Sequence, residues 1–366
     1  MLTLAGTVAV VLLVLPVLVA AVLSLDGLRH VAARLGAIGA DRPLTLVVSR
    51  RRTVGTDAVR ISLVSEWRPV LPGLRAGQHL VFDLPVEGRV VRRAYSLSRH
   101  DRWASSYEVT VKREAGGAGS GFLVDRALEG CRLTVSRARG TFLDADPARP
   151  VVLVAAGVGI TPFRAMLMAR RRRPRAGRTV LWFTARERVN LYFHDEFVAL
   201  EQAAGWFRYR PVLTGEAPAG WAGGRERLTA AAILRELPEG ADVLFCTGKA
   251  MESALIDGLV EAGLPRDRIR HEQFAAATEE AEVGGELTVV TAAGPRRLVP
   301  GRATSLLDVL DRAACAPPYE CRVGDCGHCR VEITAGTVLD LDGGGPVRGR
   351  VLACRVRPDG DATVIV

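Results

Sequence analysis

The chain has 366 residues, a formal net charge of +9, 48% hydrophobic residues and 24% charged residues. This length exceeds one ordinary domain and fits two or three domains that each bury a core, and the composition excludes a globally disordered chain. The positive charge does not indicate nucleic-acid binding, because no zinc finger, RNP-like motif or basic helix with interleaved aromatic residues accompanies it.

The first 25 residues predict a transmembrane anchor. Residues 2–25 form a nearly unbroken apolar run, and about 20 such residues cross the hydrocarbon core as a helix. Arginines follow the run, and basic residues beside a span tend to stay cytoplasmic. We therefore predict a single-pass protein of the cell membrane that contacts lipid through this helix and has cytoplasmic catalytic domains. A signal peptide or a buried helix stays open as the alternative. Residues 26–42 are predicted to be a juxtamembrane linker.

The next segment, 43–146, predicts an antiparallel β-barrel. Short β-branched stretches are separated by Gly, Pro or Asp, which is typical of such barrels. These predicted strands are 44–49, 58–64, 79–84, 93–98, 107–112 and 132–136.

The pattern changes after Pro150. Apolar strands at 151–155, 179–183 and 242–246 alternate with helical sequence, which predicts a doubly wound parallel sheet over 147–275. The arginine run that begins at Arg170 is interpreted as a solvated helix end. A polar linker at 276–284 leads to a last small domain, 285–366.

Four cysteines in the last domain have the spacing of a plant-type [2Fe-2S] site, C-x4-C-x2-C followed by a distant fourth cysteine. Zinc is the rival occupant, although zinc sites usually show paired two-residue spacings. A disulfide framework is the other alternative for an exported protein. Cys131 and Cys315 are interpreted as small buried hydrophobic residues. The predicted metal ligands are Cys321, Cys326, Cys329 and Cys354.

Two further motifs carry a family resemblance. Arg93-Ala-Tyr95-Ser96 lies on a predicted strand, and a glycine turn lies between a predicted strand and a helix. With these motifs, residues from about 42 to 274 resemble the ferredoxin–NADP reductase superfamily, and the last 80 or so residues resemble plant-type ferredoxins, which implies a β-grasp-like α+β domain. The order of the two parts is similar to that of the reductase components of bacterial oxygenases. The turn comprises Gly157, Gly159, Thr161 and Pro162.

The resemblance implies a flavin site in the barrel domain. There Arg93 neutralises the flavin phosphate, Tyr95 stacks on the isoalloxazine ring and Ser96 bonds its polar edge, as suits a guanidinium fork and an aromatic face. FAD is favoured, with FMN as the alternative. Val111, Lys112, Gly119 and Ser120 fall where this family binds the ring and the phosphates.

The resemblance also implies a site for NADH or NADPH. The glycine turn brings backbone and a helix N-terminus to the pyrophosphate. Cys246 matches the family cysteine beside the nicotinamide, although Cys-Thr-Gly-Lys replaces the usual C-G-P; an inert cysteine is the alternative. Phe274 matches the aromatic residue near the flavin, with a core-capping residue as the alternative. Arg186 suits a 2′-phosphate or is a solvated surface residue, so the choice of nucleotide stays open.

These modules predict an electron-transfer enzyme, a multidomain iron–sulfur flavoprotein oxidoreductase. Electrons pass from NADH or NADPH through the flavin and the cluster to a protein acceptor, an oxygenase, hydroxylase or desaturase at the membrane. A hybrid-cluster protein or a haem monooxygenase is an alternative acceptor. A redox-sensing membrane flavoprotein is the alternative of a different class.

Overall fold

The computed structural model describes residues 43–366 except for 67–70, 72, 100–104, 174, 273, 275–280, 320, 321, 323, 325 and 342–344. The predicted anchor at 1–25, the predicted linker at 26–42 and Cys321 lie outside the described residues. Within the described part of the chain, every helix is too short or too polar to span a bilayer.

The first described domain is a six-stranded antiparallel barrel, as predicted. Its strands follow the order β4-β3-β6-β1-β2-β5. A bridge between Leu97, directly after β4, and Val109 of β5 joins the two ends of this order. The buried faces carry Leu, Val and Ile side chains, so burial of alternate strand positions stabilises the barrel. The strands are β1 (Leu44–Val54), β2 (Ala58–Val64), β3 (His79–Val86), β4 (Arg89–Ser96), β5 (Tyr107–Lys112) and β6 (Arg132–Val135).

A short helix that the sequence pattern does not predict, α2 (Ala118–Asp125), follows β5. Its first turn contains Gly119 and Gly121, which are poor helix formers, and no side chain caps its N-terminus. The helix is anchored by Leu123, which is fully buried. Its first backbone N–H groups are therefore left for another partner.

The second domain is a five-stranded parallel sheet with the strand order β11-β10-β7-β8-β9. The predicted doubly wound architecture is confirmed, and β9 and β11 extend it beyond the three strands that the sequence indicates. The strands are β7 (Val151–Ala156), β8 (Thr179–Ala185), β9 (Phe207–Leu213), β10 (Asp242–Cys246) and β11 (Ile269–His271).

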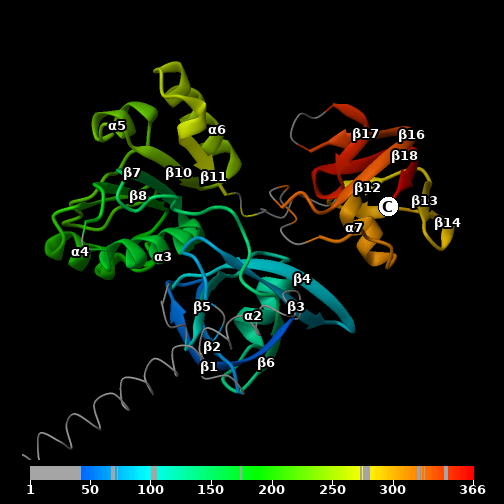
Figure 1. Ribbon diagram of the computed structural model, residues 1–366, viewed down its shortest axis with the longest axis horizontal. Coiled ribbons are helices and arrows are strands. Elements are labelled where there is room, and N and C mark those ends of the chain that lie inside the picture. Colours follow the sequence, from blue (N-terminus) through cyan, green and yellow to red (C-terminus); the bar gives the residue numbers. More distant parts are fainter. Residues whose placement is uncertain are drawn as a thin grey trace, which may run out of the picture. The chain divides into compact units, whose positions relative to one another are not determined.

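Helices cover both faces of this sheet (Figure 1). One face packs on α3 (Ile160–Arg171) and α4 (His194–Ala203), and the other packs on α5 (Ala230–Arg235) and α6 (Lys249–Glu261). Successive β7 residues alternate between the two cores, so β7 is buried on both sides, as in other parallel sheets. This burial fixes the turn that follows β7. Three single turns, η1 (Gly157–Gly159), η2 (Arg188–Asn190) and η3 (Arg266–Arg268), complete the connections.

The interpretation of the arginine run as a solvated helix end is wrong for Arg170. This residue is 1% exposed, and its Nε and Nη2 donate to the two carboxylate oxygens of Asp144 at 2.6 and 2.8 Å. Its Nη1 donates to the Arg149 and Gly177 carbonyls and to Thr179. The buried cation is compatible with the core because these partners satisfy it.

The C-terminal domain is a mixed sheet with one helix, as the β-grasp resemblance implies. Five strands follow the order β14-β13-β18-β16-β17, in which only β13 and β18 pair in parallel. The helix α7 (Leu306–Arg312) begins with a capping box between Ser305 and Asp308. The sheet comprises β13 (Leu287–Thr291), β14 (Gly294–Leu298), β16 (Arg330–Asp340), β17 (Pro346–Leu352) and β18 (Val356–Ile365), and β12 (Ala281–Val283) pairs with β15 (Gly301–Ala303).

Candidate functional site

Strand β4 and helix α2 bring the first motif together. A Cβ added to Gly119 would lie 2.8 Å from Cγ of Arg93 and 3.3 Å from the Tyr95 hydroxyl. The absence of a side chain at Gly119 therefore leaves room for these two residues beside the helix N-terminus. Tyr95 also meets the Phe82 ring edge-on at a centroid distance of 5.5 Å. The aromatic face and the guanidinium lie together as the flavin assignment requires.

The charge of Arg93 fits an anionic ligand at this place. Its Nη1 donates to the Arg92 carbonyl at 2.9 Å, and burial lowers the pKa of the guanidinium. Burial raises the pKa of Tyr95 and keeps its phenol neutral. A cation in a desolvated position gains from an anion, and the uncapped end of α2 supplies N–H groups to the same anion. These residues fit a flavin phosphate.

The other predicted flavin residues have local structural roles. Val111 is fully buried in the barrel. Lys112 lies 3.9 Å from an Asp57 oxygen and 3.7 Å from a Glu114 oxygen. The Ser120 hydroxyl donates to the Gly117 carbonyl at 3.0 Å and accepts from the Glu114 N–H at 3.1 Å. Ser120 thus holds the turn that starts α2, and its predicted contact with the flavin stays a prediction.

The glycine turn η1 packs directly on the end of β10. A Cβ on Gly159 would lie 2.0 Å from the Cys246 carbonyl oxygen and 3.2 Å from its Sγ. Gly157 has a φ of +52°, and a Cβ there would meet nothing within 4 Å, so the backbone is open on that side. The Thr161 hydroxyl donates to the Val158 carbonyl at 3.0 Å, and Pro162 is buried in the first turn of α3. The turn fits a pyrophosphate at the N-terminus of α3.

The carboxylate of Glu272, two residues before Phe274, joins the two domains. The Ser96 hydroxyl lies 3.3 Å from Oε2 of Glu272, and Oε1 of Glu272 lies 3.9 Å from Nδ1 of His79. His79 pairs with Ser96 across β3 and β4. Burial lowers the pKa of His79 to about 4, so its imidazole is neutral at physiological pH. Ser96, His79 and Glu272 form one buried polar group beside Tyr95.

The two remaining nucleotide-site predictions differ in their surroundings. Phe274 is half-buried and packs against the core cluster that contains Cys246. Arg186 is exposed directly after β8. Cys246 itself is 1% exposed at the end of β10. The structure thus brings Cys246 and Gly159 together at one edge of the sheet, and Phe274 packs on the core cluster that includes Cys246.

Two of the predicted cluster cysteines, Cys329 and Cys354, lie side by side, although the described residues contain no group of three metal-ligating side chains. The sulfurs of Cys329 and Cys354 are 3.3 Å apart and unbonded, and both residues are buried. The hydrogen bond between them lowers the pKa of Cys329 to about 7, which favours the thiolate that binds iron. Gly324 and Gly327 have φ values of +92° and +69°. The donors fit a [2Fe-2S] cluster.

The interpretation of Cys131 and Cys315 as buried residues is wrong. Both are partly exposed, because the side chain of each lies at the margin of its core. Burial of part of the Cys315 thiol still raises its pKa.

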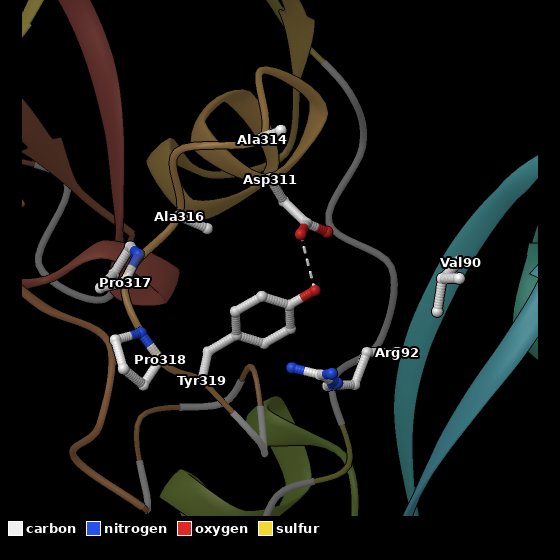
Figure 2. Close-up of a pocket in the computed structure, with 8 residues that line it drawn as sticks. All are labelled: Val90, Arg92, Asp311, Ala314, Ala316, Pro317, Pro318 and Tyr319. Carbon is white, nitrogen blue, oxygen red and sulfur yellow. Dashed lines mark hydrogen bonds between the residues drawn. The ribbon is translucent and has the colours of Figure 1, made fainter. Parts of the chain in front are cut away.

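The cluster loop is tied to α7 and to the flavin strand. Arg322, which directly follows Cys321 and has a φ of +61°, pairs with Asp308 and Asp311 at 2.5 Å each. The Tyr319 hydroxyl donates to Asp311 at 2.8 Å, and the Arg92 guanidinium lies 5.4 Å from the Tyr319 ring centroid. Figure 2 shows Tyr319 and Arg92 in a cavity of about 430 Å³ that Val90 and two prolines also line. Arg92 is the neighbour of Arg93, so this contact joins the two redox regions.

Three families match successive parts of the chain. They are the oxidoreductase FAD-binding domain over residues 45–143, the oxidoreductase NAD-binding domain over 153–256 and the 2Fe-2S iron-sulfur cluster binding domain over 291–359. The matched segments contain the flavin motif, the glycine turn and the cysteine loop, respectively.

Relatives span nearly the same three parts. The chain is 30% identical over 316 residues to the ferredoxin reductase component of 3-ketosteroid-9-alpha-monooxygenase from Mycolicibacterium smegmatis, with 79% of this chain and 86% of the relative covered. The chain belongs to the iron–sulfur flavoprotein reductase family. It is 28% identical over 299 residues to the carnitine monooxygenase reductase subunit of Escherichia coli, with 80% and 84% covered. It shares the fold of phthalate dioxygenase reductase, with a TM-score of 0.69, 23% identity and coverage of 88% of this chain and 98% of that one.

As a member of this reductase family, the chain carries FAD-binding, NAD-binding and 2Fe-2S domains, and it is an NAD(P)H-dependent oxidoreductase. The choice of FAD over FMN and of a cluster over zinc or disulfides follows from these domains. When bound, FAD supplies hydride acceptance and the cluster supplies one-electron transfer.

The reductase also has a polar contact between its first two domains that the sequence did not indicate. Arg164 of α3 is 5% exposed. Its Nη1 donates to Glu108 of β5 at 2.6 Å and to the Ser98 carbonyl at 2.8 Å, and its Nε donates to Glu196 at 2.9 Å. The sequence signal for this contact is an arginine set among the apolar residues of α3. Arg164 fixes the NAD-binding domain against the barrel, which positions Cys246 and Gly159 relative to Ser96.

Proposed function

We propose that this reductase passes electrons from NADH or NADPH to an oxygenase, hydroxylase or desaturase at the cell membrane. The observation that carries the proposal is the pair of buried sulfurs of Cys329 and Cys354, 3.3 Å apart. Cys329 belongs to the loop after Tyr319, and Tyr319 contacts the flavin strand through Arg92. A reductase whose last redox group is the flavin would not need a separate one-electron carrier. A cluster beside the flavin serves as the one-electron carrier to a protein acceptor.

The chain's own residues have distinct tasks in this proposal. Ser96 and Glu272 hold a hydrogen-bonded position at the polar edge of the flavin site, and buried Cys246 with Phe274 lines the nicotinamide side. Gly159 lets the pyrophosphate turn approach Cys246, which places the nucleotide against the flavin. Arg322 holds the loop that carries the cluster cysteines.

The acceptor class is supported by the relatives, which are named as reductase components of monooxygenases. The apolar N-terminal run supports a membrane location, because tethering the reductase beside a membrane-bound acceptor raises their effective concentration. We therefore propose a membrane di-iron desaturase or hydroxylase, or another oxygenase that acts on a lipid-like substrate.

The test of electron transfer is an anaerobic titration of the detergent-purified protein with NADH and with NADPH. The flavin and the cluster absorption bands should both bleach. Cys326→Ser should remove the cluster band, retain the flavin band and abolish cytochrome c reduction. A cluster band that survived in Cys326→Ser would show that the ligand assignment is wrong.

The membrane location has its own test. The full chain should stay with the membrane pellet after alkaline carbonate extraction, whereas a chain without residues 1–25 should not. Release of the full chain into the soluble fraction would refute the anchor and leave the electron-transfer proposal intact.

A haem monooxygenase is a second candidate acceptor. The chain is 30% identical over 297 residues to a protein from Ectopseudomonas mendocina named as the heme-dependent oxidative N-demethylase beta subunit. An acceptor panel distinguishes the two classes, because NAD(P)H-dependent reduction of a haem monooxygenase changes its haem spectrum. Slow flavin reduction without onward transfer to any acceptor would instead favour a redox sensor.

A further inference from the structure

A small cavity lies between the outer surface of the barrel and helix α3, apart from the cofactor motifs. Its volume is about 140 Å³, which equals the volume of four or five waters at about 30 Å³ each. Five arginines and one glutamate line it, so the lining has a formal excess of four positive charges. The lining residues are Arg50, Arg52, Arg60, Arg99, Arg164 and Glu108, with Ser62.

The arginines of this cavity are forced together by strand register. Arg52 of β1 lies directly opposite Arg60 of β2, and Arg50, two residues along the same face, lies opposite Ser62. Like charges in directly opposed positions destabilise an antiparallel pair. Hydrophobic burial on the other face of the barrel sets this register, so the strands cannot separate the two cations.

The one carboxylate of the cavity is already engaged. Oε1 of Glu108 accepts from Arg164 at 2.6 Å and from the Ser98 hydroxyl at 3.1 Å, and its Oε2 lies 3.7 Å from Arg60. Among the described residues, no carboxylate forms an ion pair with Arg50 or Arg52. Arg164 is paired with Glu196 as well as with Glu108, so the positive charges that no carboxylate of the described residues neutralises are those of Arg50 and Arg52.

We propose that this cavity binds a phosphoryl group. A phosphoryl group presents several oxygens and carries close to two negative charges, and guanidinium forks match its oxygens in pairs. A carboxylate has a single bidentate edge and one charge, so it would neutralise only one of Arg50 and Arg52. The bound anion would bridge arginines of β1 and β2 to Arg164 of α3, and would thereby link the barrel to the NAD-binding domain. Free phosphate and the headgroup of an anionic lipid share this chemistry.

The test uses the full chain in detergent at constant ionic strength, with inorganic phosphate, short-chain phosphatidic acid or acetate as the titrant. Binding is measured by calorimetry and by the midpoint of thermal unfolding. Arg52→Gln and Arg60→Gln should each weaken phosphoryl binding about tenfold, as expected for a lost hydrogen bond to a charged group. Arg89→Gln, an exposed change on β4 outside the cavity, should leave the binding unchanged.

A second readout separates binding from a general effect on folding. Without phosphate, Arg52→Gln should raise the unfolding midpoint because it removes the repulsion from Arg60. At one phosphate concentration, the midpoint of the wild type should rise more than that of the variant. Saturable binding of inorganic phosphate identifies free phosphate as the ligand source, and binding of phosphatidic acid alone identifies a lipid headgroup. Binding of neither compound, equal binding of acetate, or binding that Arg52→Gln leaves intact would overturn the proposal.

Discussion

Gly159→Ala tests the packing of the nucleotide turn on the end of β10. The added Cβ would lie 2.0 Å from the Cys246 carbonyl oxygen, whereas real Cβ atoms essentially never come closer than 3.0 Å. The nearest atom is backbone, so no side-chain rotation relieves the overlap. The turn and the strand end must therefore separate by about 1 Å.

A displacement of this size should act mainly on hydride transfer. A misplacement of about 1 Å can cost about 10²-fold in rate, because the reacting groups leave their aligned positions. We expect the rate of flavin reduction by NADH or NADPH to fall by about this factor, measured anaerobically by stopped-flow absorbance. The flavin content should not change, since Arg93, Tyr95 and Gly119 lie on the barrel domain.

The matched control is Gly205→Ala. Gly205 is exposed, and an added Cβ would meet nothing within 4 Å, so this variant should reduce its flavin at the wild-type rate. If Gly159→Ala also reduced its flavin at the wild-type rate, the contact between η1 and Cys246 would not position the nucleotide.

Three further changes test other parts of the structure. Arg170→Met should lower the free energy of unfolding, measured in urea, by about 3–5 kcal/mol, because it leaves the Asp144 carboxylate buried without its partner. The double variant Arg170→Met/Asp144→Leu should recover most of this loss. An equal loss in the single and the double variant would show that the ion pair between Arg170 and Asp144 is not the cause. His79→Phe should make the free energy of unfolding less dependent on pH below about pH 6.5. Burial lowers the pKa of His79 to about 4 from 6.5, so its contribution is complete above pH 6.5 and is lost as the pH falls, by about 2 kcal/mol at pH 5; an unchanged profile would contradict this. Tyr319→Leu should slow electron transfer from the flavin to the cluster about two- to fivefold, because it removes the ring beside Arg92. In stopped-flow measurements, the rate of flavin reduction in this variant and both rates in the Tyr319→Phe control should equal those of the wild type. A wild-type transfer rate in Tyr319→Leu would show that the ring does not contribute.

Local sequence signals predict most of the fold. The strands 58–64, 107–112 and 242–246 match β2, β5 and β10 in both bounds, because alternating or continuous apolar residues lie between clear turn residues. Strand β9 was missed because Arg208, Arg210 and Pro211 interrupt its apolar pattern. Tertiary pairing with β8 outweighs that weak local preference.

The site could be predicted where a motif is contiguous and not where partners are distant. Arg93, Tyr95 and the glycine turn are recognisable from neighbouring residues. By contrast, Arg170 is buried by Asp144, which lies 26 residues away, and Glu272 meets Ser96 across 176 residues. No local pattern specifies such pairings, so nothing in the arginine run itself marks Arg170 as its buried member.

The hydrogen bond between Ser96 and Glu272 has a consequence for biosynthesis. The barrel leaves the ribosome first, yet the carboxylate that completes its polar edge belongs to the far end of the following domain. A nascent barrel therefore presents Ser96 and His79 without Glu272 until the whole nucleotide domain has emerged. The site that receives the hydride is thus completed late in translation. A chain truncated within the second domain would lack the Glu272 carboxylate beside Ser96 and His79.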